Sequence, residues 1–219
     1  MKYKLTNETM TTDSGVLLHR IECVKSFGNV RAGDVGGWIE KEENLSQDGD
    51  CWVYDNARVY GNAEVCDNTK VYDNAEVYGN SEVYGNAWVY GNAEVYGNAK
   101  VCDNAKVYGN AKVYGNAWLY GNAKVCGNAK VCGNAWVCGN AWVCGNAEIC
   151  NIKDYIVFKN NWSTGRCFTW TRSNDKWKVG CFYGTGKELI EKAHKDSKLS
   201  GDCYNAYVEL VEKLKELQK

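Results

Sequence analysis

Cysteine supplies the most reactive side chains of this chain, and most of its 12 cysteines recur at one position of a six-residue unit. Cys126 and Cys144, for example, lie three units apart. Thiols at this spacing are able to form disulfides, to bind a metal ion or to act as nucleophiles. However, the repeat lacks both histidine and the C-x-x-C spacing of zinc knuckles. We therefore expect reduced thiols, no metal site and no cofactor.

Histidine, the most common general base of enzymes, occurs only twice in the chain. His19 and His194 both lie outside the repeat, where a structural role is more common than a catalytic one. The glycine-rich residues 184–187 precede a predicted helix, but they lack the spacing of a phosphate-binding loop and indicate a turn and cap. We therefore expect no catalytic residue and no enzymatic activity.

Tryptophan and lysine gather in the last copies of the repeat. One outward position of the unit changes from mainly tyrosine to cysteine near residue 126, which removes bulk around the neighbouring tryptophans. Shallow apolar grooves would result, and the C-terminal segment, a second copy or a partner is expected to cover them. The predicted partner-binding residues are Trp118, Trp136, Trp142, Lys124 and Lys130, with Trp170 and Arg172 from a later aromatic and basic segment.

These side chains depend for their positions on the repeat itself, which runs from Val53 to Glu148 as sixteen copies of V-[YC]-[GD]-N-[AST]-x. Strand alternation turns the small apolar first and fifth positions inward. Gly or Asp followed by Asn makes a tight corner. Three strands and three corners close a coil of eighteen residues, and stacked coils pair in parallel. The sequence therefore predicts a mainly β chain with a three-sided parallel β-helix.

The segments on either side of the repeat predict two further domains. Residues 1–28 break the period and are expected to cap the first coil, which leaves 29–152 for the β-helix. The chain from residue 151 onward contains 13 Lys+Arg against 9 Asp+Glu, whereas the rest of the chain is acidic. Three strand-like segments and two amphipathic helices follow one another there. We expect a small β-β-β-α-α domain over 153–219.

The unit resembles the hexapeptide repeat [LIV]-x-x-x-[STAV]-x of left-handed parallel β-helix proteins. This resemblance implies left-handed coils. The best-known proteins with the repeat are acyltransferases, for which it implies a trimer, an acyl-CoA or acyl-carrier donor and a catalytic histidine. Because no histidine and no pocket-forming loop interrupt the sixteen copies, an acyltransferase is the less favoured hypothesis.

A second resemblance covers nearly the whole chain. The opening LTNET, the segment GDVGGWIEKEENLS, the VYGNA array and the ending FTWTRSNDKWKVGCFYGTGKELIEKA are similar to small repeat proteins of bacteriophage and prophage genomes, some of them labelled polymer-forming. The resemblance implies a protein that binds a host protein, a defence component among the candidates, and inhibits or modulates it in the host bacterial cytosol. The last coils and the C-terminal domain are the predicted recognition end.

Two further hypotheses remain open. One is a structural protein that self-assembles end to end or side by side, as bactofilins do. Filaments would favour this hypothesis, whereas the dimer or trimer that we expect for the binding protein would count against it. The other is a nucleotide or nucleic-acid binder that uses rows of lysine and aromatic residues, although a net charge of −1 does not favour nucleic acid. Its stacking and phosphate-contact surface in the C-terminal segment would consist of Phe168, Trp170, Trp177, Arg166, Arg172 and Lys178. A membrane protein is not expected, because no apolar stretch reaches 18 residues.

Overall fold

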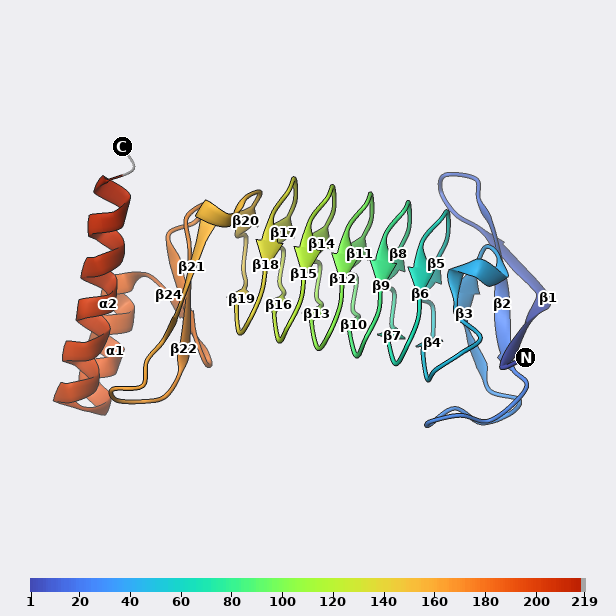
Figure 1. The fold of residues 1–219 in the computed structure, drawn as a ribbon, viewed down its shortest axis with the longest axis horizontal. Helices are drawn as coiled ribbons and strands as arrows, with labels where there is room; N and C mark the ends of the chain where they lie inside the picture. The colour runs from blue at the N-terminus through green and yellow to red at the C-terminus, as the bar shows by residue number, and fades with distance from the viewer. Residues whose placement is uncertain (218–219) are drawn as a thin grey trace.

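The computed structural model describes residues 1–217. An elongated solenoid carries an antiparallel hairpin at one end and a small α+β module at the other (Figure 1). The hairpin joins β1 (Tyr3–Thr11) to β2 (Leu17–Cys23), and β2 pairs with β3 (Val35–Ile39). Because β3 also pairs in parallel with β5 (Arg58–Val59), the first sheet passes from the hairpin directly into the solenoid. A short 3-10 helix, η1 (Glu42–Asn44), follows β3.

Each of the sixteen copies contributes one two-residue strand, and Glu148 with Ile149 forms a seventeenth. The strands are β4 (Trp52–Val53), β5, β6 (Glu64–Val65), β7 (Lys70–Val71), β8 (Glu76–Val77), β9 (Glu82–Val83), β10 (Trp88–Val89), β11 (Glu94–Val95), β12 (Lys100–Val101), β13 (Lys106–Val107), β14 (Lys112–Val113), β15 (Trp118–Leu119), β16 (Lys124–Val125), β17 (Lys130–Val131), β18 (Trp136–Val137), β19 (Trp142–Val143) and β20 (Glu148–Ile149).

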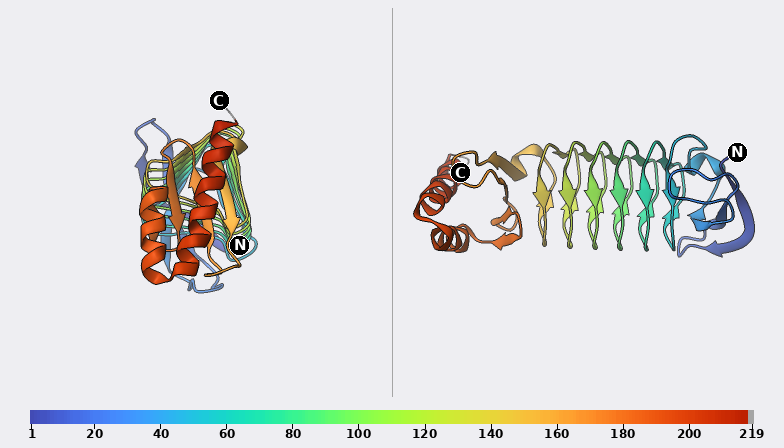
Figure 2. Two further views of the ribbon diagram at one scale, coloured as in Figure 1. Left: turned by 90° about the vertical axis from the view of Figure 1, so that its left-hand side faces the viewer. Right: turned by 90° about the horizontal axis from the view of Figure 1, so that it is seen from below.

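These strands form three parallel sheets, one on each side of a prism. Their orders are β3-β5-β8-β11-β14-β17-β20, β4-β7-β10-β13-β16-β19 and β6-β9-β12-β15-β18. Each residue pairs with the residue three units later, as Lys106 does with Lys124. The predicted three-sided parallel β-helix is confirmed, and Figure 2 shows its coils stacked in regular rows.

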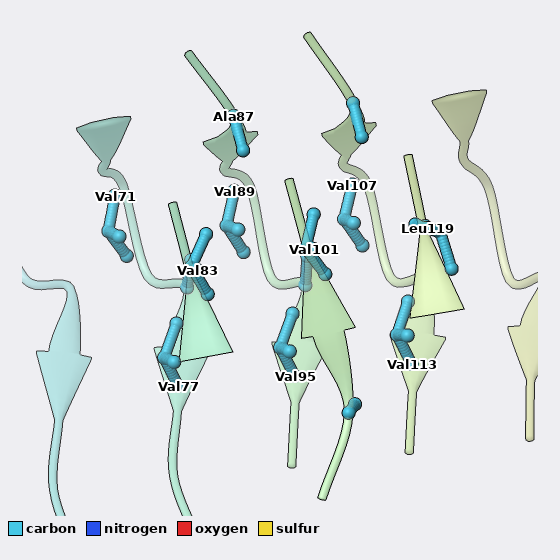
Figure 3. Close-up of a cluster of buried hydrophobic side chains, with 14 of the residues drawn as sticks. Val71, Val77, Val83, Ala87, Val89, Val95, Val101, Val107, Val113 and Leu119 are labelled. Atoms are coloured by element: carbon cyan, nitrogen blue, oxygen red, sulfur yellow. The ribbon is translucent and has the colours of Figure 1, made fainter. Parts of the chain in front are cut away.

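Small apolar side chains fill the interior of the prism. Val71, Val77 and Val83 come from the three different sheets and are fully buried (Figure 3). Thr69 and Ser81 replace alanine at two inward positions, and both hydroxyls donate to carbonyl groups of the next coil, at 3.3 Å in each case. The interior therefore leaves no polar group of these two residues unpaired, in keeping with a tightly packed core.

The corners depend on residues that adopt the left-handed backbone conformation. Gly91, for example, has φ +74°, and Asp73 in the preceding coil has φ +60°. The invariant asparagines stack from coil to coil through side-chain hydrogen bonds, such as the 3.1 Å bond that Asn62 Nδ2 donates to Asn80 Oδ1. These amide ladders stabilise all three edges of the prism.

The C-terminal module consists of an antiparallel sheet and two helices. Its elements are η2 (Ile152–Asp154), β21 (Tyr155–Lys159), β22 (Cys167–Thr171), β23 (Lys176–Val179), β24 (Phe182–Gly184), α1 (Gly186–Asp196) and α2 (Lys198–Glu216). The third predicted strand segment forms two strands, β23 and β24, because Gly180, with φ +55°, allows the chain to turn back between them. The domain limits expected from the sequence stay predictions.

The sheet of this module separates the helices from the last coil (Figure 1). One face packs on α1 and α2 around an aromatic core that includes Phe168 and Trp177. The other face meets the solenoid, where the backbone N–H of Trp142 donates to Thr169 Oγ1 at 2.9 Å. The module therefore covers the end of the β-helix, whose last strands would otherwise be open to another chain. No helix within residues 1–217 is long and apolar enough to cross a membrane.

Candidate functional site

A crevice of about 340 Å³ opens where β16 and β19 meet the C-terminal module, and we call it the end crevice. It is lined by Asn122, Lys124, Asn140 and Trp142 of the solenoid and by Lys159, Arg166, Cys167, Lys178 and Gly180 of the module. Its volume matches a small ligand, or one projecting group of a larger ligand.

Trp142 organises the end crevice. It follows Lys124 by one coil, and both side chains point outward because each directly precedes an inward valine. Lys124 Nζ lies 4.8 Å from the centroid of the indole ring, and Lys178 Nζ of β23 lies 4.1 Å from it. Cation–π attraction holds both ammonium groups at the ring. The indole thus fixes one positive charge from the solenoid and one from the C-terminal module.

The charge of the end crevice has one sign. Lys159 and Arg166 join Lys124 and Lys178, and no Asp or Glu occurs among the described residues that line it. Lys124 and Lys178 are half-buried, whereas Lys159 and Arg166 are exposed. Half-buried cations without a nearby carboxylate attract an anion more strongly than fully solvated ones do. Arginine and lysine are the usual ligands of phosphate and carboxylate groups. The arrangement is therefore suited to an anionic ligand.

Two cysteine thiols, those of Cys126 and Cys144, lie close to Trp142 in the structure or in the sequence. Cys126 and Cys144 are buried ladder neighbours, and the indole Nε1 donates to Cys126 Sγ at 3.3 Å. A hydrogen bond from Cys144, together with those from Tyr108 and Trp142 and with the charge of Lys178, lowers the pKa of Cys126 to about 6. The same hydrogen bond and burial raise the pKa of Cys144. The pair therefore loses its first proton at a lower pH than an isolated cysteine does.

Only two of the predicted binding residues, Lys124 and Trp142, lie in the end crevice. Trp118 and Trp136 belong to β15 and β18 on another side of the prism, where their ring centroids are 5.6 Å apart. Trp136 remains 50% exposed. The C-terminal module therefore packs against Trp142, whereas at Trp136 it contacts the backbone, where Tyr155 OH donates to the carbonyl of Trp136 at 3.0 Å, and leaves half of the side chain exposed.

The other predicted residues lie elsewhere. Lys130 is exposed on β17, on the side of the prism that is formed by the sheet from β3 to β20. Trp170 and Arg172 of the module line a smaller crevice of about 130 Å³ beside α2, and Trp170 Nε1 donates to Asp175 Oδ1 at 2.8 Å. The structure thus distributes the seven predicted residues over four places, and their role in binding stays a prediction.

Three cations of the end crevice are absent from the predicted set. Lys178 alternates with the buried Trp177 and Val179 in β23, so strand alternation alone places it opposite the helices. Lys159 and Arg166 flank the loop between β21 and β22 and have no comparable pattern. Arg166 and Lys178 belong to the phosphate-contact surface of the nucleic-acid hypothesis, whereas the positive charge of the C-terminal segment is the one signal that indicates Lys159.

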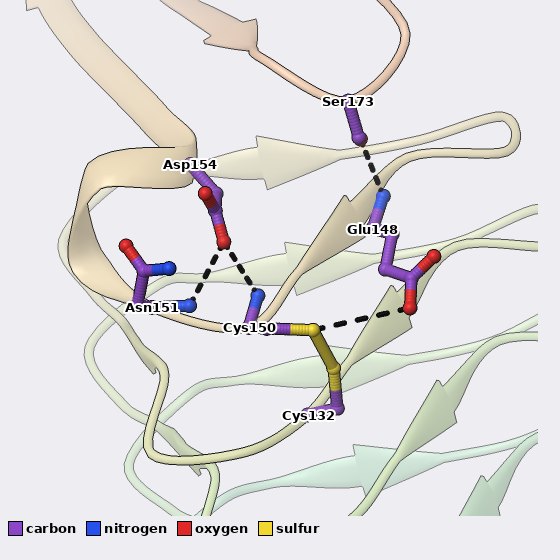
Figure 4. The surroundings of a disulfide bond; sticks show 6 residues. All are labelled: Cys132, Glu148, Cys150, Asn151, Asp154 and Ser173. Carbon is purple, nitrogen blue, oxygen red and sulfur yellow. Dashed lines mark hydrogen bonds between the residues drawn. A yellow bond between two sulfur atoms is a disulfide. The ribbon is translucent and has the colours of Figure 1, made fainter. Parts of the chain in front are cut away.

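One pair of ladder cysteines is oxidised. Cys132 and Cys150, whose Cα atoms are 4.6 Å apart, form a disulfide between consecutive coils (Figure 4). The expectation of reduced thiols is therefore wrong for this pair, because coil stacking brings the two residues within disulfide range. The other ten cysteines carry free thiols.

Comparison with known proteins supports the repeat architecture. A family described as YdcK beta solenoid repeat matches residues 53–67. The curated protein "Uncharacterized acetyltransferase YdcK" of Escherichia coli (strain K12) is 38% identical over a segment that covers 26% of this chain and 20% of the relative. The chain is thus a hexapeptide-repeat-like β-solenoid protein, and it matches about a fifth of the length of this relative.

The same match corrects one expectation. The lack of histidine in the repeat predicts that the chain is not an enzyme, whereas the relative carries the name of an acetyltransferase. The missing histidine excludes one general base only, because other side chains, lysine and cysteine among them, also transfer protons.

Proposed function

We propose that the chain is a binding protein of the phage or prophage type, and that its end crevice binds an anionic group of a host protein. The meeting of Lys124, Lys159, Arg166 and Lys178 in a crevice without a carboxylate carries the proposal. The resemblance of both ends of the chain to phage repeat proteins supports a partner in the host cytosol. Occupation of an anionic group of that partner would inhibit or modulate it.

A second function is favoured by the name of the Escherichia coli relative. Acetyl-CoA carries three phosphate groups, and the cations of the end crevice suit such a donor as well as they suit a protein. Under this hypothesis the crevice holds the phosphates of acetyl-CoA while an acceptor nucleophile receives the acetyl group.

A capture experiment with matched variants tests the first function. Lys124→Gln with Lys178→Gln removes two charges of the end crevice, and Lys192→Gln with Lys195→Gln removes two exposed lysines of α1 that do not line it. Each protein serves as bait in a bacterial lysate. We expect a stoichiometric partner with the wild type and the control variant, and loss of at least nine-tenths of it with the crevice variant. Equal capture by both variants would contradict the assignment.

The same proteins separate the two functions. Release of free CoA thiol from acetyl-CoA in the presence of lysate acceptors, lost in the crevice variant alone, would replace the binding function by acetyl transfer. A dimer or trimer remains part of the proposal, and native mass determination tests it. Filaments that grow with concentration would instead favour the self-assembling structural protein.

A further inference from the structure

Two thiols and a carboxylate lie close together at the last coil. They are at the edge between the side of the prism that contains β17 and β20 and the side that contains β18. The Sγ atoms of Cys132 and Cys150 and a carboxylate oxygen of Glu148 all lie within 4.8 Å of one another. Cys150 Sγ is 3.9 Å from Glu148 Oε1 (Figure 4). The linear spacing of these residues resembles no metal motif, because stacking of the coils, and not the local sequence, brings them together.

We propose that the reduced form of this cluster binds a thiophilic divalent cation, for which Zn²⁺ is the best match. Two thiolates, one carboxylate oxygen and a water molecule complete the tetrahedral set that zinc prefers. Two sulfur atoms bound to one zinc ion lie about 3.8 Å apart at Zn–S distances of about 2.3 Å. The Cα separation of 4.6 Å between the two cysteines accommodates that geometry without a change in coil spacing.

The backbone around the cluster is held independently of the disulfide. The N–H of Cys132 donates to the carbonyl of Ile149 at 2.8 Å, which keeps the two coils paired. Asp154 Oδ2 accepts the N–H groups of Cys150 and Asn151 at 2.8 and 2.9 Å. Because these bonds occupy Asp154, the exposed Glu148 is the carboxylate available to the metal ion. Reduction of the disulfide should therefore leave the ligands in place.

Metal binding at this cluster requires prior reduction of the disulfide. A dithiol reductant transfers two electrons and two protons to the Cys132–Cys150 bond and is itself oxidised to a disulfide. The two thiols then lose two protons as they bind the divalent cation. The oxidised protein has no thiolate at this position, so metal binding and disulfide formation exclude each other.

The pair formed by Cys126 and Cys144 provides an internal control. It has the same spacing in the sequence, but an indole and tyrosine side chains surround it, and it is not part of any group of potential metal ligands within residues 1–217. The proposed site shares no residue with the end crevice, so it is independent of the proposed function.

The full-length chain is first reduced with a dithiol, and the dithiol is then removed under nitrogen so that it does not bind the metal ion. Titration of the reduced chain with Co²⁺ tests the proposal. We expect a thiolate-to-cobalt charge-transfer band that saturates at one equivalent, that Zn²⁺ abolishes and that the oxidised protein lacks. Cys132→Ser should lose the band, and Cys126→Ser should behave as the wild type. Glu148→Gln, a change at an exposed residue, should bind Co²⁺ at least tenfold more weakly. Circular dichroism shows whether each variant is folded. If Cys132→Ser does not fold, the affinity of Glu148→Gln for Co²⁺ tests the proposal in its place. Absence of the band in the reduced wild type, or its loss in Cys126→Ser alone, would overturn the proposal.

Discussion

Trp142 makes three kinds of contact, and each connects the solenoid to the C-terminal module or to a thiol. Its backbone N–H donates to Thr169, its indole N–H donates to Cys126, and its ring attracts the ammonium group of Lys178. A phenylalanine at this position would keep an aromatic ring but lose the indole donor. The residue is therefore a suitable place to separate the hydrogen bond from the packing.

Trp142→Phe should raise the pKa of Cys126 from its value of about 6, because the thiolate loses one of the hydrogen bonds that stabilise it. The measurement is a titration of thiolate ultraviolet absorbance, taken as the difference between each protein and the same protein with Cys126→Ser. Trp136→Phe serves as the control and should leave the value unchanged. An unaltered titration in Trp142→Phe would show that the indole does not stabilise the thiolate.

The low pKa of Cys126 also predicts a pH dependence of stability. Between pH 6 and pH 9 the folded protein has lost a proton at Cys126 that the unfolded chain retains, so the free energy of unfolding rises with pH. Cys126→Ser should flatten this part of the curve, as measured by urea unfolding at several pH values. A parallel curve for the variant would assign the dependence to other groups.

Among the elements, the three outward ladders differ in how their charges are paired. On two sides of the prism both signs of charge occur, and some unlike neighbours form ion pairs, as in Arg58 with Glu76 at 2.9 Å and Lys100 with Glu82 at 2.9 Å. On the side formed by β4, β7, β10, β13, β16 and β19, the residue that precedes the inward valine of each strand is either Lys or Trp. Lysines of this side therefore rest on indole rings, as Lys106 does on Trp88 at 3.9 Å, and remain available to an anion.

The corners of the solenoid allow a controlled test of coil stacking. Gly91 and Gly139 both have left-handed backbone, with φ of +74° and +64°. A Cβ atom at Gly91 would lie 3.0 Å from the backbone of Gly109, whereas one at Gly139 would meet no atom within 4 Å. Both alanine variants should lose about 1–2 kcal/mol of stability from the backbone conformation. Gly91→Ala should lose more than Gly139→Ala in urea unfolding, and an equal loss would mean that the neighbouring coil gives way freely.

The repeat makes most of the fold predictable, since a period of six residues determines which side chains stack. The alignment of Lys124 with Trp142, for example, follows from counting along the sequence, and the structure contains that pair. Lys178 is different, because its place over the same indole depends on how a non-repeating sheet packs on the last coil. Counting by eighteen residues also aligns Cys132 with Cys150, and Glu148 is two residues from Cys150. A linear metal motif does not include such ligands, because they come from adjacent coils.

At the scale of the whole molecule, the two ends of the prism are finished differently. The N-terminal hairpin continues a solenoid sheet edge to edge, and its β2 pairs with β3 along the backbone. The C-terminal module instead meets the last coil with a sheet face, where side chains and not strand pairs form the contact. A junction of this kind leaves space between side chains, and the end crevice lies in that space. The location of the proposed site is thus a consequence of the way in which the solenoid ends.

Isothermal titration with pyrophosphate tests most directly whether the end crevice binds an anionic group. We expect one site per chain in the wild type, affinity that falls as salt is added, and binding at least tenfold weaker in Lys124→Gln with Lys178→Gln. Lys192→Gln with Lys195→Gln, which removes two exposed lysines of α1, should bind as the wild type does. No measurable heat at low salt, or equal binding by the two double variants, would contradict the account.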